Sequence, residues 1–565
     1  MIVKCLTTEA EKKATEDGEG TNDEETNSVE RVRTVEYRDE EGAEHEHIVV
    51  DWEGPDDKEN PKNWPLPTKV LFITMVGLLT TSIYIGSSIY VPGVQQIMED
   101  FNVSLTVGYL PMSLFVIGYG IGPMVFSPLS EHPAIGRVYI YVITLAIFVI
   151  LQVPTALSKN IGSLIVLRFL AGIFASPALA TGGASVGDVL TLSWMPVGLA
   201  SWGISAVCGP VLGPLIGGAI SVGLNWRWTF WFLLILSGFT FTVLFFFFPE
   251  TSQATLLYRK AQRLRKRADN NKILSEGHLK IEQMHINEVT VDTLWRPIEI
   301  MFGEPVVFFI NLYIALMYAI MYLWFEAFPI VFVETHGFTM VETGVGYVSI
   351  MVGVFLGSAG YLPAIYKAFT VPMERGEWQQ PEIFLPTSIV GAVCQPIGVF
   401  IFAWSATASA HWIAPLIGAT LFAVGAFVGF QTLFNYLAFS FPRYQASVFA
   451  GNGLFRAGLA AAFPLFANAL YRNLGPKNFP IGWGCSILGF FNLAMIAIPV
   501  LLYTNGVKLR ARSKVVLWSW GHTPTPDTLA PVRGLRVCHK SLRGEENNIH
   551  LLHQTHSETP TSLSV

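Results

Sequence analysis

One acidic residue, Glu326, lies inside a long apolar stretch and could do chemistry there. Charged groups are costly in apolar surroundings, so such a residue is a functional candidate. Its carboxyl group could bind and release a proton. At helical spacing Tyr318, Tyr322 and Phe325 share its face, and their rings could hold a cationic or aromatic molecule. The alternative is a solvated carboxylate near the end of the stretch, because Glu326 follows Val306 by twenty residues.

Other polar side chains interrupt apolar stretches. Arg168 lies alone in one of them. Gln431 and Asn435 are one helical turn apart in a second stretch, and Asn452 and Arg456 are one turn apart in a third. On an apolar helix such residues normally point into a helical bundle, where they either bind helices together or line a cavity. Both interpretations stay open for the two pairs.

The elements that must position these residues are apolar runs of roughly twenty residues, the length that crosses a bilayer as a helix. Hydrophobic residues make up 51% of the 565-residue chain and charged residues 14%, whereas soluble domains carry about a quarter charged residues. The sequence therefore predicts an all-α membrane protein with twelve transmembrane helices in two six-helix bundles. The predicted spans are residues 70–91, 106–127, 138–156, 162–184, 196–220, 229–249, 306–333, 343–366, 382–405, 412–437, 446–470 and 482–505.

Charged segments divide the chain into parts. The first fifty residues carry fifteen Asp and Glu against six Lys and Arg, which is typical of a disordered tail. A basic run, Arg259–Arg267, lies between the sixth and seventh spans, and such runs usually face lipid and fix topology. The predicted parts are an acidic disordered tail (1–69), a first bundle (70–249), a linker (250–305), a second bundle (306–505) and a C-terminal tail (506–565).

Loop charges predict the orientation in the membrane. From Arg137 to Lys514, loops on the side of the basic run carry seventeen Lys and Arg, and loops on the other side carry four. Because positively charged loops stay in the cytoplasm, we expect both termini and the linker there. Asn102-Val103-Ser104 is then a glycosylation sequon in the first outside loop. Asn102 is either a used site or a chance match too close to the membrane.

Several function classes find no support in the sequence. A net charge of −6 does not favour nucleic acid as a partner. The five cysteines are widely spaced, which predicts neither a disulfide framework nor a zinc site, and we expect no cofactor. No HExxH, GxSxG or paired-carboxylate pattern of an enzyme occurs in a span. A Walker lysine motif for ATP is also missing.

An acid and an arginine share a tight turn after the second predicted span, which contains Glu131, Gly136 and Arg137. Charge-assisted hydrogen bonds could clamp helix ends here in one conformation and release them in another. The turn resembles the loop between spans two and three of the major facilitator superfamily, although Ser127 stands where the common pattern has glycine. Asp188, expected on the same side of the membrane, is a second gating candidate.

Glycines and prolines in the fifth predicted span could form a bend between closely packed helices. Glycines four residues apart let another backbone approach, and prolines remove helical hydrogen bonds. This would suit an interface between rocking bundles, and ordinary small-residue packing is the simpler interpretation. The Gly-Pro-x-x-Gly-Gly pattern resembles the antiporter motif of drug:proton exchangers. The run contains Gly209, Gly213, Pro214, Gly217 and Gly218.

Further short motifs extend the resemblance. With Pro61–Trp64, Trp226–Trp228 and Phe248–Thr251, residues 51–514 resemble the fungal twelve-span drug:proton antiporter family. In that family the motif around Arg168 is associated with proton transfer. A structural arginine bonded to the carbonyls of a neighbouring helix is the alternative for this residue.

The resemblance implies a secondary transporter, not an enzyme, that exports drugs, toxins or secondary metabolites from the plasma membrane by alternating access. Its expected partners are protons, a small organic substrate and membrane lipid, and we expect a monomer. A facilitator or symporter for a small nutrient is the next alternative. A membrane enzyme or a receptor is less favoured.

Overall fold

Twelve helical spans form the body of the protein in a computed structural model, which describes residues 32–38, 44–270, 272–283, 295–441, 445–476 and 478–512. Within these residues, each of the twelve spans is long and apolar enough to cross a membrane. Every predicted span overlaps one of them, so the all-α fold with twelve transmembrane helices is confirmed. All twelve belong to one compact unit, residues 20–33 and 47–520. A second unit comprises residues 1–19, 34–46 and 521–565.

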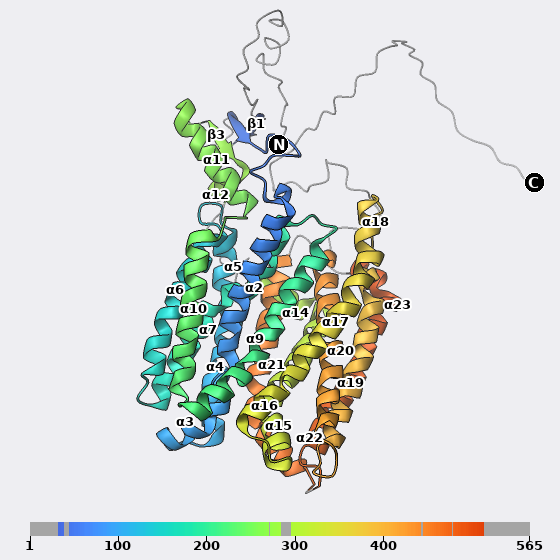
Figure 1. Cartoon of the computed structure of the whole chain (residues 1–565). Coiled ribbons are helices and arrows are strands. Elements are labelled where there is room, and N and C mark those ends of the chain that lie inside the picture. Colours follow the sequence, from blue (N-terminus) through green and yellow to red (C-terminus); the bar gives the residue numbers. More distant parts are fainter. Residues whose placement is uncertain are drawn as a thin grey trace, which may run out of the picture. The chain divides into compact units, whose positions relative to one another are not determined.

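The first half of the membrane body consists of α2 (Leu66–Ser88), η2 (Val91–Gly93), α3 (Val94–Phe101), α4 (Leu105–Ile121), α5 (Pro123–Glu131), α6 (Arg137–Ala156), α7 (Ile161–Ala180), α8 (Gly182–Val189), α9 (Met195–Gly223) and α10 (Arg227–Phe247). Figure 1 shows these helices side by side in blue to green. Pro123 begins α5 directly after α4, and Pro210 and Pro214 lie inside α9. Proline lacks the N–H that closes a helical turn, so helices bend or break at such points.

The second half consists of α15 (Pro305–Phe328), η4 (Pro329–Thr335), α16 (Met340–Gly346), α17 (Val348–Ile365), η5 (Tyr366–Thr370), α18 (Val371–Glu374), η6 (Pro381–Phe384), α19 (Leu385–Ser405), α20 (Ile413–Ser440), α21 (Gln445–Leu474), α22 (Gly482–Met495) and α23 (Ala497–Arg512). In Figure 1 they run from yellow to red. The segment η4 is π-helical and directly continues α15. Such wide turns are frequent at functional sites.

The remaining elements lie before the first span or between the two halves. They are β1 (Val32–Arg38), β2 (Glu44–Val50), η1 (Pro61–Asn63), α11 (Gln253–Ala268), β3 (Ile273–Ser275), α12 (Glu276–Gln283) and α14 (Arg296–Gly303). We call the end of the spans that joins α11 and α14 the linker side, and the other end the opposite side. Figure 1 shows α11 at its upper end and α3, α16 and α22 toward its lower end.

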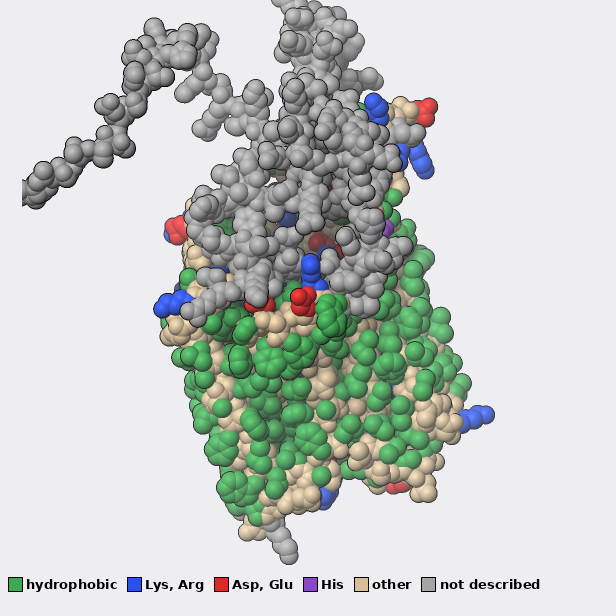
Figure 2. Space-filling model, turned by 180° about the vertical axis from the view of Figure 1, so that it is seen from behind, with side chains coloured by type: hydrophobic (Ala, Val, Ile, Leu, Met, Phe, Trp, Pro, Cys, Tyr) green, Lys and Arg blue, Asp and Glu red, His purple; other side chains and the backbone are tan. Residues whose placement is uncertain are grey.

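The lateral surface of the helices is apolar, as a lipid-facing surface must be. Figure 2 shows hydrophobic side chains over most of the helical body, with charged side chains gathered toward the upper, linker side. Large apolar residues stay exposed along the spans, such as Ile235 (67%), Val390 (64%) and Phe246 (70%). A soluble protein rarely exposes apolar patches of this extent. The pattern agrees with the membrane location predicted from composition.

The predicted acidic tail is folded over part of its length. The prediction of a disordered segment over residues 1–69 is wrong for residues 48–69, where β2 pairs in parallel with β3 and α2 already begins at Leu66. The paired residues are Ile48 with Ile273, Val49 with Leu274 and Val50 with Ser275. Residues 1–31 lie outside the described part of the chain. At the other end, α23 continues to Arg512, seven residues into the predicted tail.

The basic helix α11 is held by acids of this N-terminal segment, so its prediction as a purely lipid-facing run is wrong for part of its surface. The Lys260 ammonium lies 2.9 Å from a Glu53 carboxylate oxygen and 3.7 Å from an Asp57 oxygen. Arg263 pairs with Glu59 at 3.2 Å. Only 5% of Lys260 is exposed. The sequence concealed this arrangement because the pairing residues are more than two hundred positions apart.

A histidine completes the small folded region around α11. His278 on α12 stacks on Tyr258 with ring centroids 4.0 Å apart, and the Ser275 hydroxyl lies 2.9 Å from its Nδ1. Burial, and secondarily the positive charge of Arg265, lowers the pKa of His278 to about 4. The imidazole is therefore neutral at pH 7, which suits a packed ring beside a basic helix.

The glycines of α9 provide close helix packing, mostly within the first half. Cβ atoms added at Gly213 and Gly217 would overlap Ser88 and the carbonyl oxygen of Ile89, and one at Gly209 would lie 2.6 Å from the Cβ of Tyr84. All three contacts are made with the first span. The predicted rocking interface is thus wrong for these glycines, because their shared face packs on α2 of the same half.

Gly218 faces the other half. A Cβ there would lie 3.0 Å from the carbonyl oxygen of Met340 on α16. A Cβ at Gly344 of α16 would in turn lie 3.0 Å from the carbonyl oxygen of Pro214. The two halves therefore touch through backbone at the opposite side, where Gly218 and Pro214 of the motif meet α16.

We expect Gly217→Val to destabilise the protein, because the added side chain would overlap the backbone of Ile89, which lies between α2 and η2. Overpacking of this kind costs about 1–3 kcal/mol. Thermal unfolding in detergent measures the effect. Gly223→Ala on the same helix is the matched control, since a Cβ at Gly223 has nothing within 4 Å. Equal melting temperatures for the two variants would contradict the packing described.

We expect Lys260→Gln to loosen the segment formed by residues 48–57, because Glu53 and Asp57 would lose their buried counter-charge. Hydrogen–deuterium exchange of these amides should accelerate about tenfold, which corresponds to roughly 1.4 kcal/mol. Lys266→Gln on the exposed face of α11 is the control. Unchanged protection in Lys260→Gln would refute the clamp.

Candidate functional site

Two cavities lie between the halves of the protein, one toward each side. The larger, of about 210 Å³, is on the opposite side and is lined by η2, α3, α4 and α9 from the first half and by α15, η4, α16 and α21 from the second. The smaller, of about 30 Å³, is on the linker side and is lined by α4, α5, α7 and α9 together with α20 and α21. A solute placed between the halves would therefore contact both of them.

Glu326 lines the larger cavity from α15. Only 4% of the residue is exposed, which does not support the alternative of a solvated carboxylate. Its Oε1 makes no hydrogen bond to any described group. A buried carboxylate without a counter-charge is costly, and a proton or a ligand removes that cost. The geometry therefore fits a group that binds a proton or a substrate, and the role itself stays a prediction.

The aromatic rings beside Glu326 differ from those predicted. Phe325 lines the same cavity, and so do Tyr109 of α4 and Tyr347 at the start of α17. Tyr318 and Tyr322 do not line it. Tyr318 shares a helical face with Glu326 but does not reach the same cavity, because residues eight positions apart are separated by about 12 Å along a helix axis. The prediction of one acid enclosed by Tyr318, Tyr322 and Phe325 is therefore wrong in its first two rings.

Tyr318 and Tyr322 instead form a cluster with Tyr119 that joins the halves. The Tyr119 hydroxyl donates to that of Tyr318 at 3.1 Å, and the Tyr322 hydroxyl lies 3.5 Å from both of the others. On α15 the two residues lie one and two turns from Glu326 toward the linker side. The tyrosine cluster thus lies between Glu326 of the larger cavity and the smaller cavity, which Tyr119 also lines.

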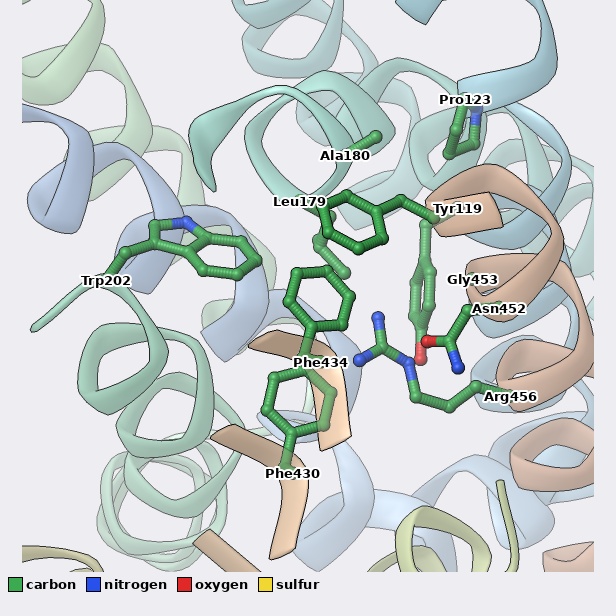
Figure 3. A pocket seen from close by; sticks show the side chains of 11 residues that line it. Tyr119, Pro123, Leu179, Ala180, Trp202, Phe430, Phe434, Asn452, Gly453 and Arg456 are labelled. Carbon is green, nitrogen blue, oxygen red and sulfur yellow. The ribbon is translucent and has the colours of Figure 1, made fainter. Parts of the chain in front are cut away.

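Arg456 of α21 reaches the smaller cavity. Its guanidinium carbon lies 4.8 Å from the ring centre of Tyr318 and 5.4 Å from that of Phe430. Figure 3 shows the guanidinium pointing into the cavity between Tyr119 and the rings of Phe430 and Phe434. The sequence predicted a polar group on this face, and its aromatic surroundings became evident only when α4, α15 and α20 were placed beside it.

The other polar residues of the two predicted pairs, Gln431, Asn435 and Asn452, bind helices together. Asn435 donates to the Tyr361 hydroxyl at 3.2 Å and to the Gln431 carbonyl at 2.7 Å. The Gln431 amide packs on the backbone of Gly203 in the other half. Asn452 donates to Asn311 at 2.8 Å and also lines the smaller cavity. Both interpretations left open by the sequence therefore apply to Asn452.

Arg168 is fully buried in the first half. It donates to the Gly86 carbonyl of α2 at 2.5 Å, and its guanidinium carbon lies 4.1 Å from the ring centre of Phe115. The rings of Tyr90 and Phe230 are 5.3 and 5.7 Å away. This contact agrees with a structural arginine bonded to a helix carbonyl. A role in proton transfer stays a prediction.

On the linker side Arg137 pairs with a different acid from the one in its own turn. We call Arg137 and its partners the latch, after the gating role predicted for them. The Arg137 Nε lies 2.6 Å from Asp188 Oδ2, and its Nη2 donates to Oδ1 at 3.1 Å. Asp188 also accepts from Thr251 at 3.2 Å. Glu131 of the same turn is exposed at the end of α5. The acid that the fold brings to the arginine is therefore Asp188 of α8, and the gating roles of Glu131 and Arg137 stay predictions.

Glu250 is a latch residue that sequence reasoning did not single out. It accepts hydrogen bonds from the backbone N–H groups of Arg137 and Val138 at 3.2 and 3.4 Å, which caps the start of α6. Gly136 permits this approach with a φ of +79°, and a side chain there would overlap Glu250. The motif Phe248–Thr251 was the available signal, since it places an acid directly after the sixth span.

The halves contact each other on both sides of the protein. On the linker side Trp194 donates to Glu374 at 2.6 Å, and Thr370 donates to the Ser193 carbonyl at 2.9 Å. On the opposite side Gly218 packs on α16 as described above. Separation of the halves on either side would have to break these contacts.

Asn102, the glycosylation candidate, ends α3 at the opposite side. It has a left-handed φ of 51° and is exposed. Nothing in this geometry decides whether a glycan is attached, so its modification stays a prediction.

Comparison with known proteins agrees with this architecture. The family model described as Major Facilitator Superfamily matches residues 76–464. The "Cycloheximide resistance protein" of Candida maltosa is 55% identical over 474 residues, covering 83% of this chain and 86% of its own length. The "Fluconazole resistance protein 1" of Saccharomyces cerevisiae is 45% identical over 464 residues, covering 82% of this chain and 84% of its own length.

Solved structures show the same fold at low identity. The proton:xylose symporter XylE superposes with a TM-score of 0.53 at 15% identity, covering 77% of this chain and 96% of its own. The human organic anion transporter MFSD10 gives a TM-score of 0.51 at 15% identity, covering 77% of this chain and 100% of its own. The match of the family model over most of the spans, together with these relatives, shows that the chain belongs to the Major Facilitator Superfamily.

Proposed function

We propose that the protein exports small organic molecules by alternating access, with protons moving in the opposite direction. The observation that carries this proposal is the pair of cavities between the halves, one toward each side, with the tyrosine cluster between Glu326 and the smaller of them. When the linker side opens, the smaller cavity admits a solute. When the opposite side opens, the larger cavity releases it.

Proton coupling is assigned to Glu326. This carboxyl lines the cavity that opens to the opposite side, and it has no counter-cation among the described ion pairs. A proton bound from that side would neutralise it and allow the cavity to close around an uncharged site. Return of the proton on the linker side would complete one cycle.

The class of cargo follows from the relatives. Their names report resistance to cycloheximide and to fluconazole, and others are named multidrug transporters. These compounds differ in shape, which suits walls of aromatic and aliphatic side chains that can repack. We assign the chain to the plasma membrane as a multi-pass monomer in contact with lipid, with both termini in the cytoplasm.

Expression in a host that lacks its own drug pumps tests the proposal. The protein should raise resistance to several toxic compounds and lower their accumulation, and a protonophore should abolish the effect. Unchanged accumulation of every compound would refute export. Uptake of a compound down its gradient would favour a facilitator.

We expect Glu326→Gln to remove the dependence of export on the external pH, because a neutral amide cannot carry a proton. Initial efflux rates of the variant, measured between external pH 5 and 8, should no longer depend on pH. At the lower pH they should be about tenfold below those of the wild type. Glu342→Gln is the control, since Glu342 is an exposed acid on α16 in a capping box that glutamine preserves. A normal pH profile in Glu326→Gln would exclude the coupling role.

We expect Asp188→Asn to slow transport at least about tenfold, because it leaves the buried Arg137 guanidinium without its counter-charge. Losing one partner of such a pair costs about 2–5 kcal/mol. Efflux rates corrected for the amount of protein at the membrane measure the effect. Glu131→Gln should change the rate far less. The reverse order of the two variants would contradict the role of Asp188 as the main partner of Arg137.

A further inference from the structure

The smaller cavity contains a positive charge that no acid of the described chain neutralises. Arg456 has no carboxylate within ion-pair distance among the described residues, and its Nε makes no hydrogen bond. The other arginine that lines one of these cavities is paired. Arg472 at the larger cavity lies 2.7 Å from Glu334. Arg456 is thus available to a ligand.

The walls around Arg456 are aromatic. Phe430, Phe434 and Trp202 lie across the cavity from it, and Tyr119 lies beside it (Figure 3). The Trp202 indole nitrogen already donates to Thr80 at 3.2 Å, so this ring offers the cavity mainly its apolar surface. A ligand that fills this space would place an apolar ring system between the phenyl rings and a polar group on the guanidinium.

A guanidinium offers several N–H donors in a plane and accepts nothing. It therefore binds carbonyl and carboxylate oxygens and repels ammonium groups. The attraction between the Arg456 guanidinium and the rings of Tyr318 and Phe430 holds the guanidinium in place. These ring contacts do not satisfy its N–H donors. The chemistry of the cavity consequently selects for oxygen acceptors and against cations.

Resting on the export function proposed above, we infer that the linker-side cavity takes uncharged or anionic ring compounds that present carbonyl or carboxylate oxygens to Arg456. Lipophilic cations are poor ligands of this cavity, and the expectation of a cationic or aromatic molecule beside Glu326 concerns the other cavity. Glu326 lines the larger cavity and Arg456 the smaller one, so neither cavity contains both charges.

The present conformation leaves about 30 Å³ of free space around Arg456, enough for a water molecule but not for such a compound. Entry therefore requires the halves to separate on the linker side, where Trp194 bonds to Glu374. The ligand would then reach Arg456 from the side on which an exporter must collect its cargo.

Transport of matched probes by the full chain in proteoliposomes tests the inference. The probes are three coumarins of similar size, one uncharged, one bearing a carboxylate and one bearing a trimethylammonium group. The wild type should transport the first two at least tenfold faster than the third. Arg456→Gln should lower the rates of the first two by about tenfold or more and leave the third unchanged or faster. Arg456→Lys should retain part of the carboxylate transport, because it keeps the charge.

Arg375→Gln, an exposed arginine at the end of α18, is the matched control and should keep the wild-type order of rates. A measurement on the wild type alone distinguishes a loss of ligand binding from a folding defect in the Arg456 variants. In detergent, the carboxylate coumarin should raise its melting temperature, and the trimethylammonium coumarin should not.

Equal transport of all three probes, or a wild type stabilised by the cationic probe alone, would overturn the inference while leaving export intact. Failure to transport either the uncharged or the anionic coumarin would also overturn it. Loss of the export function itself would show in the resistance screen, where no compound would be expelled.

Discussion

Lipid offers no hydrogen bonds, and this constraint decides where every polar group of the protein lies. Charged side chains are concentrated at the ends of the spans and between the halves, and the lateral surface is apolar. The few charges within the spans therefore point inward, toward one another or toward the cavities. Arg168 bonds to a helix carbonyl, whereas Glu326 and Arg456 face space that a solute can occupy.

Under the same constraint, the contacts between the two halves differ between the two sides of the protein. Small residues bring backbones together at the opposite side, as Gly218 does against α16. Hydrogen bonds of side chains join the halves on the linker side and in the tyrosine cluster. Polar contacts can exchange one partner for another during a rocking motion, whereas tight backbone packing resists such a motion. The glycines of α9 that pack on α2 make close backbone contacts of this kind within the first half.

The latch and the folded linker region are continuous. Glu250 caps α6, and α11 begins three residues later at Gln253. The acids of the N-terminal segment hold α11 through Lys260. A Cβ at Gly277 would lie 2.8 Å from Pro133 in the turn before Arg137. The linker thus packs against the latch turn through several independent contacts.

The sequence by itself determined the class of fold and its spans, because hydrophobic length is a local property that lipid enforces on every helix. It also identified Glu326, Arg168 and Arg456 as unusual, since a charge in an apolar run is visible without a fold. It could not supply their partners. Periodicity describes one helix, whereas Asp188 lies 51 residues from Arg137 and Tyr119 lies 199 from Tyr318. Only the packing of distant helices decided that Arg137 pairs with Asp188, that Tyr318 and Tyr322 join Tyr119 and not Glu326, and that Arg456 faces a cavity without a neutralising acid.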